Sequence, residues 1–106
     1  ALIDEGFKPR IKYTKITSDS LGRTISFSWK FDHPDLDQFI IYRKKGKDGY
    51  LAVFKYLPKN FQSYIEKDIE YNLLYSYSIM ATFKDGSETK LTLPLDAFII
   101  KSKKND

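Results

Sequence analysis

The stretch Thr24-Ile25-Ser26-Phe27-Ser28-Trp29-Lys30-Phe31 alternates apolar and polar residues without a break. Because successive side chains of a strand point to opposite faces of a sheet, this alternation predicts a half-buried strand over residues 24–31. One face of that strand carries the large apolar side chains of Ile25, Phe27, Trp29 and Phe31. Side chains of this size need an opposing apolar layer, so the stretch favours a sandwich of two sheets.

The composition indicates one domain whose core is built from aromatic residues. The chain has 106 residues, no cysteine and 16% Phe, Trp and Tyr. A chain of this length can bury a sufficient core without disulfides, and aromatic side chains fit the pleated surface of a sheet. The lack of cysteine excludes a disulfide framework and a thiolate metal site, but it leaves the cellular compartment open.

The charge is only slightly positive, with 18 Lys and Arg against 14 Asp and Glu. The dense basic run at residues 43–47 lacks the interleaved aromatics of a nucleic-acid-binding stripe, and we interpret it as a solvated loop. We therefore expect no nucleic-acid partner. We also expect no membrane insertion, because no stretch reaches the roughly 18 apolar residues that a spanning helix needs.

Further alternating or apolar runs supply the other strands of the sandwich. Residues 75–83 alternate as clearly as 24–31, and residues 39–42 are apolar throughout, which is typical of a strand covered on both faces. The remaining strands are expected at residues 10–16, 50–57, 61–65 and 88–93. Pro94 should interrupt the last of these, with residues 95–100 resuming along the same edge.

The chain is expected to divide into a sandwich and two short flanking segments. Residues 1–8 mix charged residues with Gly6, and we interpret them as a lead-in or linker. The sandwich should occupy residues 9–100. Residues 101–106 are polar and are expected to form a disordered tail, because they cannot bury enough surface to become ordered.

The order of these features resembles the fibronectin type III domain over most of residues 9–93. Residues 25–29 look like that family's strand B, which ends in tryptophan, and residues 38–43 look like its Gly-Tyr-x-Val-Tyr-Arg strand C. The family also writes Leu-x-Pro-Gly-Thr-x-Tyr-x-(aromatic)-x-Val-x-Ala. The matching positions here are Ile69, Tyr75, Tyr77, Ile79 and Ala81, whereas Tyr71, Asn72 and Leu73 depart from the usual Pro, Gly and Thr.

This resemblance implies an all-β fold, a seven-stranded antiparallel immunoglobulin-like sandwich of the fibronectin type III type. It also implies that Tyr75 is the tyrosine of the E–F corner and that Trp29 faces it as the second structural anchor. Ile25, Phe27 and Ile79 would complete the core. Domains of this type commonly serve as non-catalytic spacers or binding modules in larger proteins, so the resemblance implies an extracellular or cell-surface location.

Few residues could carry catalysis or bind a metal. The single histidine, His33, lies in a short polar loop, and we interpret it as a solvated turn residue. Asp32, Asp35 and Asp37 could surround a calcium ion, but the loop lacks the glycine and the distal glutamate of a calcium-binding loop. The sequence therefore predicts no enzyme, no catalytic residue, no cofactor and no metal site.

An apolar excess on residues 39–42 indicates a contact surface. If Phe39 and Ile41 face the core, then Ile40 and Tyr42 point outward beside Met80. An aromatic row is expected alongside, formed by Tyr50, Phe54 and Tyr56. Exposed apolar patches typically bind partners, so we expect a neighbouring domain or another protein here.

Two alternatives remain for this patch. Lysine side chains and the segment at residues 98–100 could fold across it, in which case it needs no partner. Tyr50 or Tyr56 could instead stack on a sugar, which would make the chain a carbohydrate-binding accessory module of a secreted enzyme.

Overall fold

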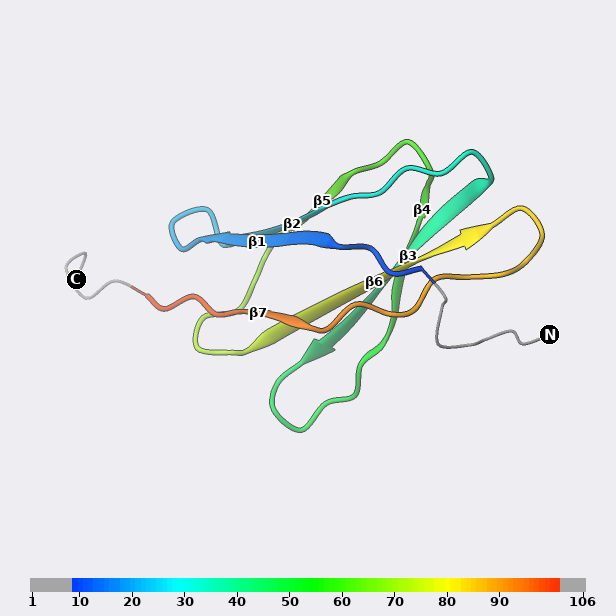
Figure 1. The fold of residues 1–106 in the computed structure, drawn as a ribbon. Coiled ribbons are helices and arrows are strands. Elements are labelled where there is room, and N and C mark those ends of the chain that lie inside the picture. Colours follow the sequence, from blue (N-terminus) through cyan, green and yellow to red (C-terminus); the bar gives the residue numbers. More distant parts are fainter. Residues whose placement is uncertain (1–8, 102–106) are drawn as a thin grey trace.

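The computed structural model describes residues 9–101, which form two antiparallel sheets packed as a sandwich (Figure 1). The seven strands are β1 (Tyr13–Asp19), β2 (Thr24–Lys30), β3 (Leu36–Lys45), β4 (Ala52–Pro58), β5 (Ser63–Glu66), β6 (Tyr75–Phe83) and β7 (Leu95–Ala97). One sheet has the order β1-β2-β5 and the other β4-β3-β6-β7. The predicted all-β sandwich is confirmed. The expectations for residues 1–8 and 102–106 lie outside the described residues.

The core lies between the inner faces of β2 and β6, where both predicted alternations are present. Ile25, Phe27 and Trp29 are at most 2% exposed, and so are Tyr75, Tyr77 and Ile79 from the facing sheet. The ring of Phe27 stacks on Tyr77 at 5.7 Å between centroids, and Trp29 meets Phe39 edge-on at 5.4 Å. Aromatic contacts between the sheets therefore hold the two layers together.

The tyrosine corner that the sequence predicts is present before β6. The Glu70 backbone N–H donates a hydrogen bond to the Tyr75 hydroxyl at 2.9 Å. Asn72, which stands at the usual glycine position, has a φ of 64°, and its N–H donates to the Ile99 carbonyl at 2.8 Å. Asparagine tolerates this left-handed backbone, so the corner forms without the family's glycine.

Tyr75→Phe should lower the free energy of unfolding by about 1 to 2 kcal/mol, because it keeps the ring in the core and removes only the acceptor for the Glu70 N–H. Denaturant unfolding measures this loss. Tyr71→Phe is the matched control, since the Tyr71 hydroxyl donates to the Ser20 carbonyl at an exposed position. A Tyr75→Phe midpoint equal to that of the unmodified chain would show that the corner bond does not stabilise the fold.

The predicted strand at residues 88–93 is wrong. The segment contacts β6 through an isolated bridge between Glu88 and Thr82 and through two threonines, Thr89 and Thr92. The backbone N–H groups of these threonines donate to the Ala81 and Ile79 carbonyls at 2.9 and 3.0 Å. The Thr89 and Thr92 hydroxyls accept the backbone N–H groups of Ala81 and Ile79, each at 3.0 Å. Because these side chains take the place of backbone carbonyls, the segment follows β6 without forming a regular ladder. Regular pairing returns after Pro94 as β7, as the sequence predicts.

The first strand lies three residues later than predicted, at Tyr13–Asp19 instead of 10–16. Before it, Arg10 forms a parallel bridge with Lys90 of the other sheet's edge, and Ile11 is 2% exposed in the core. The chain therefore crosses from one sheet to the other before β1 pairs with β2. In the middle of the chain, β4 and β5 each begin two residues later than predicted.

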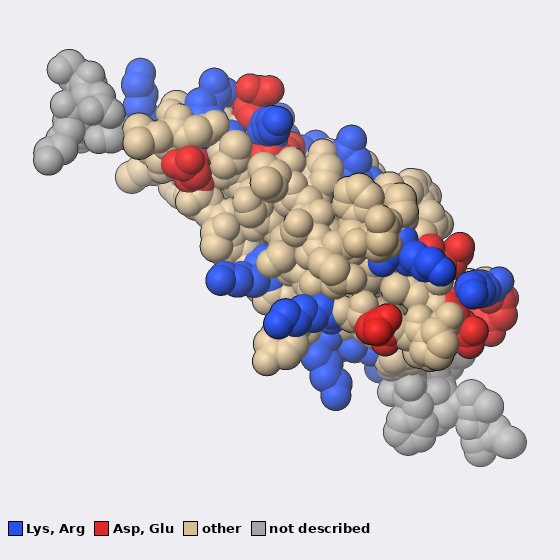
Figure 2. Space-filling model, turned by 90° about the horizontal axis from the view of Figure 1, so that it is seen from above, with Lys and Arg blue, Asp and Glu red and all other residues tan. Residues whose placement is uncertain are grey.

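The charged side chains are scattered around this sandwich. On the face shown in Figure 2, Lys and Arg lie among Asp and Glu, mostly toward the margins, and they do not gather into one stripe. Within residues 9–101, no helix is long and apolar enough to cross a membrane.

Candidate functional site

The outer face of the four-stranded sheet brings together the residues that the sequence predicts as a contact surface. In the register of β4, β3 and β6, Ile40 lies opposite both Tyr56 and Met80. In the next outward row, Tyr42 lies opposite both Val53 and Ser78. We call these two rows the outer ladder; it consists of Tyr56, Ile40, Met80, Val53, Tyr42 and Ser78.

Exposure is uneven along the outer ladder. Ile40 and Met80 are only 8% and 9% exposed, although both point away from the core cluster. Tyr42 is partly buried, whereas Val53 and Tyr56 are 46% and 59% exposed. The accessible apolar surface therefore lies at the β4 edge of the sheet, displaced from the centre that the sequence predicts. Val53 was not among the predicted contact residues.

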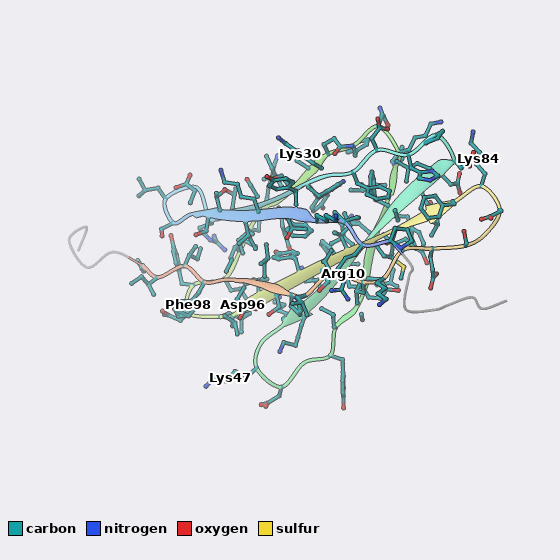
Figure 3. All side chains as sticks on the ribbon, viewed as in Figure 1. Arg10, Lys30, Lys47, Lys84, Asp96 and Phe98 are labelled. Atoms are coloured by element: carbon teal, nitrogen blue, oxygen red, sulfur yellow. The ribbon has the colours of Figure 1, made fainter. Side chains whose placement is uncertain are left out.

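The segment at residues 98–100, the alternative cover for this patch, follows β7 at the edge of the sheet opposite β4. Ile99 is 1% exposed and belongs to the core cluster, while Phe98 and Ile100 are about half exposed, at 49% and 57%. In Figure 3, Phe98 lies beside Asp96 near the C-terminal end of the described chain. The exposed side chains of β4 are left without a cover from this segment.

The prediction that Phe54 belongs to the outer aromatic row is wrong. Ile41 pairs with Lys55 and Tyr42 pairs with Val53, so a bulge leaves Phe54 without a partner on β3. A bulge re-aims side chains, and Phe54 packs against the core cluster. Its ring meets Tyr64 of β5 edge-on at 5.8 Å. Of the other two members of that row, Tyr56 lies on β4, while Tyr50 lies in the loop before it and is 87% exposed.

A second correction concerns the basic run, because Arg43, Lys44 and Lys45 belong to β3 instead of a loop. Arg43 faces inward and forms an ion pair with Glu66 of β5, and the two side chains are 23% and 14% exposed. The Arg43 guanidinium also lies 4.0 Å from the centre of the Phe54 ring. We call this contact between the two sheets the inter-sheet ion pair.

Tyr77 is hydrogen-bonded to the inter-sheet ion pair. Its hydroxyl donates to the Glu66 carboxylate at 2.6 Å. Burial and this carboxylate raise the pKa of Tyr77 well above its usual range, so the hydroxyl stays protonated. The alternation of Phe39, Ile41 and Arg43 on one face of β3 is the sequence signal that could have revealed the inward arginine. The arrangement joins the two sheets.

The predicted loop around the single histidine has the geometry of a turn. The His33 Nδ1 accepts a hydrogen bond from the Asp35 backbone N–H at 3.1 Å, and the imidazole lies 4.7 Å from the Phe83 ring. Over residues 9–101, no group of three or more His, Cys, Asp or Glu side chains is placed to hold a metal ion.

Comparisons with known proteins match the structure but not the sequence. No protein-family model and no curated protein sequence matches this chain. An Fn3-like protein from Clostridium thermocellum has a TM-score of 0.69 at 17% identity, over 91% of this chain and 97% of that one. A fourth FNIII domain from human has a TM-score of 0.68 at 6% identity, over 97% and 92% of the two chains.

A third similar structure is the kinase region of twitchin from C. elegans, with a TM-score of 0.65 at 18% identity. The match covers 92% of this chain and 19% of that one, so the chain spans about a fifth of the twitchin region. The two sheets and the tyrosine corner define an immunoglobulin-like sandwich. Together with these similarities they show that the chain has the fibronectin type III fold.

Proposed function

We propose that this chain is a non-catalytic fibronectin type III module of a larger protein, where it acts as a spacer and as a contact unit for a protein partner. The described chain begins and ends at opposite ends of the sandwich (Figure 1). This arrangement suits a module joined in series to its neighbours. An extracellular or cell-surface location is part of the proposal and rests on the resemblance of the fold to modules found there.

The observation that carries the contact role is the apolar row that runs from the exposed edge of β4 onto the sheet. Tyr56 and Val53 lie in register with Ile40 and Tyr42, so a partner covering the edge would extend an existing apolar surface. Natural sheets rarely leave an apolar edge strand uncovered, because it promotes aggregation. Tyrosine is also enriched at the centre of protein interfaces, whereas lysine is depleted there.

The partner is a protein surface with its own apolar centre. Lys59 is exposed just after β4. Lys55 is exposed on β4 with its ammonium 5.7 Å from the centre of the Tyr64 ring of β5, so both lysines would lie at the rim of a contact that covers the β4 edge. Charges at a rim affect the association rate more than the affinity. Tyr50 and Tyr56 lie on different elements, so their arrangement does not favour a sugar platform on this side of the molecule.

The combined change Val53→Ser and Tyr56→Ser should weaken this contact strongly while changing the free energy of unfolding by at most about 1 kcal/mol, because both side chains are exposed. Ile40→Ser is a poor probe, since its nearly buried side chain also stabilises the sheet. Lysine crosslinking of the intact protein, followed by mapping of crosslinks from Lys55 and Lys59, measures the contact.

The unmodified protein should give crosslinks from these lysines to residues outside the module. A neighbouring domain and a separate protein are distinguished by the polypeptide to which the crosslinked peptide belongs. Tyr13→Ser, at a 67% exposed position on the other sheet, is the control and should keep the crosslinks. Crosslinks that persist unchanged in the double variant would contradict the contact role of β4.

A further inference from the structure

The chain contains two Asp-Gly pairs, Asp48-Gly49 and Asp85-Gly86, and each lies in an exposed turn. The first lies between β3 and β4, and the second follows β6. Because β3 and β6 pair antiparallel, the two turns lie at opposite ends of this strand pair, as the labelled residues Lys47 and Lys84 show in Figure 3. The two sites share their chemistry and differ in their surroundings, so each serves as a control for the other.

An aspartate that precedes glycine can cyclise, because glycine has no side chain to shield its backbone nitrogen. The glycine nitrogen bonds to the carbon of the side-chain carboxyl, and the carboxyl hydroxyl leaves as water together with the amide proton. Water then opens the five-membered imide at either of its carbonyls, so that a C–N bond breaks and the nitrogen regains its proton. One product is aspartate. The other is isoaspartate, in which the main chain runs through the former side-chain carboxyl.

Hydrogen bonds hold both reacting groups of Asp85-Gly86. The Asp85 Oδ1 accepts the Ser87 hydroxyl at 2.6 Å and the Ser87 backbone N–H at 2.9 Å. The bond from the hydroxyl, together with that from the N–H, holds the pKa of the Asp85 carboxyl below its usual range, which favours the ionised form that has no hydroxyl to lose. The Gly86 N–H donates to the Phe83 carbonyl at 2.9 Å. Cyclisation at Asp85 therefore requires these hydrogen bonds to break.

Asp48-Gly49 lacks these restraints. The Asp48 side chain is exposed and has no hydrogen bond or ion pair with any of residues 9–101. The Gly49 nitrogen lies 3.5 Å from the Gly46 carbonyl oxygen, a distance longer than that of an ordinary N–H···O hydrogen bond. Neither the carboxyl nor the amide that must meet is held in place.

The backbone also requires glycine at position 49. A Cβ atom added to Gly49 would lie 2.7 Å from the Lys45 carbonyl oxygen, which is too close for van der Waals contact. A residue with a side chain would therefore displace the end of β3. The fold keeps the reactive pair in the connection between β3 and β4.

We propose that Asp48 is a site of spontaneous isomerisation in the folded chain and that the fold protects Asp85, which belongs to the same kind of dipeptide. Isoaspartate at position 48 adds one methylene group to the main chain of the connection that leads into β4. Its free carboxylate is then bonded directly to the α-carbon. Tyr50, which is 87% exposed, follows closely and should be displaced, whereas the sheets should keep their structure because the connection lies on the surface.

Incubation of the full chain at physiological temperature and mildly acidic pH, where more carboxyl groups are protonated, tests the proposal. Peptide mapping with electron-transfer fragmentation measures the isoaspartate at positions 48 and 85. We expect isoaspartate to accumulate severalfold faster at position 48. In the chain denatured with guanidinium chloride at the same pH and temperature, the two positions should react at comparable rates, because glycine follows both.

Two variants test the role of the hydrogen bonds. Ser87→Ala removes the hydroxyl that donates to Asp85 and should raise the rate at position 85 severalfold without changing the rate at position 48. Asp48→Glu should abolish the reaction at position 48, because glutamate would have to form a six-membered ring, which closes far more slowly. Thermal unfolding should show that both variants remain folded.

Equal rates at positions 48 and 85 in the folded chain would overturn the proposal. A ratio of the two rates that is as large in the denatured chain as in the folded chain would also overturn it, because the local sequence would then set the difference. An unchanged rate at position 85 in the Ser87→Ala variant would contradict the protection of Asp85 by Ser87.

Discussion

Trp29→Ala should lower the free energy of unfolding by about 3 to 5 kcal/mol, the typical cost of removing a large aromatic side chain from a core. The indole is 2% exposed and lies 5.6 Å from Phe27 and 5.4 Å from Phe39 between ring centroids. Its buried Nε1 has no hydrogen-bond partner within residues 9–101. The loss should therefore come from packing and from the cavity that remains between the sheets.

Denaturant unfolding followed by circular dichroism measures this loss, since the chain has one tryptophan and the variant loses its fluorescence probe. Trp29→Phe is the matched control. It keeps an aromatic ring and removes the unpaired N–H, so it should cost clearly less than Trp29→Ala. A Trp29→Ala loss below about 1 kcal/mol would show that the inner face of β2 is not the centre of the core.

Glu66→Ala should lower the free energy of unfolding by about 2 to 4 kcal/mol, the second largest effect that we expect. The substitution removes the partner of Arg43 and the acceptor of the Tyr77 hydroxyl in one step. The Arg43 side chain is only 23% exposed, so its charge would be left largely desolvated. We do not expect the largest losses of stability that follow when a fully buried ion pair is broken, because both partners keep some contact with water.

A double-mutant cycle with Arg43→Met separates the charge effect from lost packing, and denaturant unfolding measures all four proteins. With Arg43 replaced, Glu66→Ala should cost less than it does alone, because no unpaired guanidinium remains. Glu66→Gln keeps an acceptor for Tyr77, so its free energy of unfolding should lie between those of the unmodified chain and Glu66→Ala. Costs for Glu66→Ala that are the same in both backgrounds would show that the ion pair does not couple the sheets.

The alternation of apolar residues was sufficient to predict the central strands. β2 differs from the prediction by one residue, and β6 has the bounds that the alternation indicates. A two-residue period is set locally by the strand backbone, so it can be read without knowing the partners. The same reasoning placed Ile40, Tyr42 and Met80 on one outer face.

The errors arose where a distant partner decides the structure. Nothing near Phe54 signals the bulge that turns its ring inward. Residues 88–93 alternate like a strand, although the hydroxyls of Thr89 and Thr92, three positions apart, replace ladder carbonyls. Arg43 resembled a loop residue because its partner, Glu66, is 23 positions away. The low exposure of Ile40 also depends on neighbouring strands. The sequence could therefore predict that this side chain points away from the core, but not that its neighbours bury it.

The most direct test of the proposed contact surface is hydroxyl-radical footprinting of tyrosine side chains. The measurement compares the oxidation rates of Tyr56 and Tyr13 in the isolated module with those in the intact protein within its native assembly. Tyr56 and Tyr13 are similarly exposed, at 59% and 67%, but they lie on different sheets. We expect Tyr56 to be oxidised several times more slowly in the native assembly and Tyr13 to be unchanged. A Tyr56 rate in the native assembly equal to that in the isolated module would contradict the proposal that a protein partner covers β4.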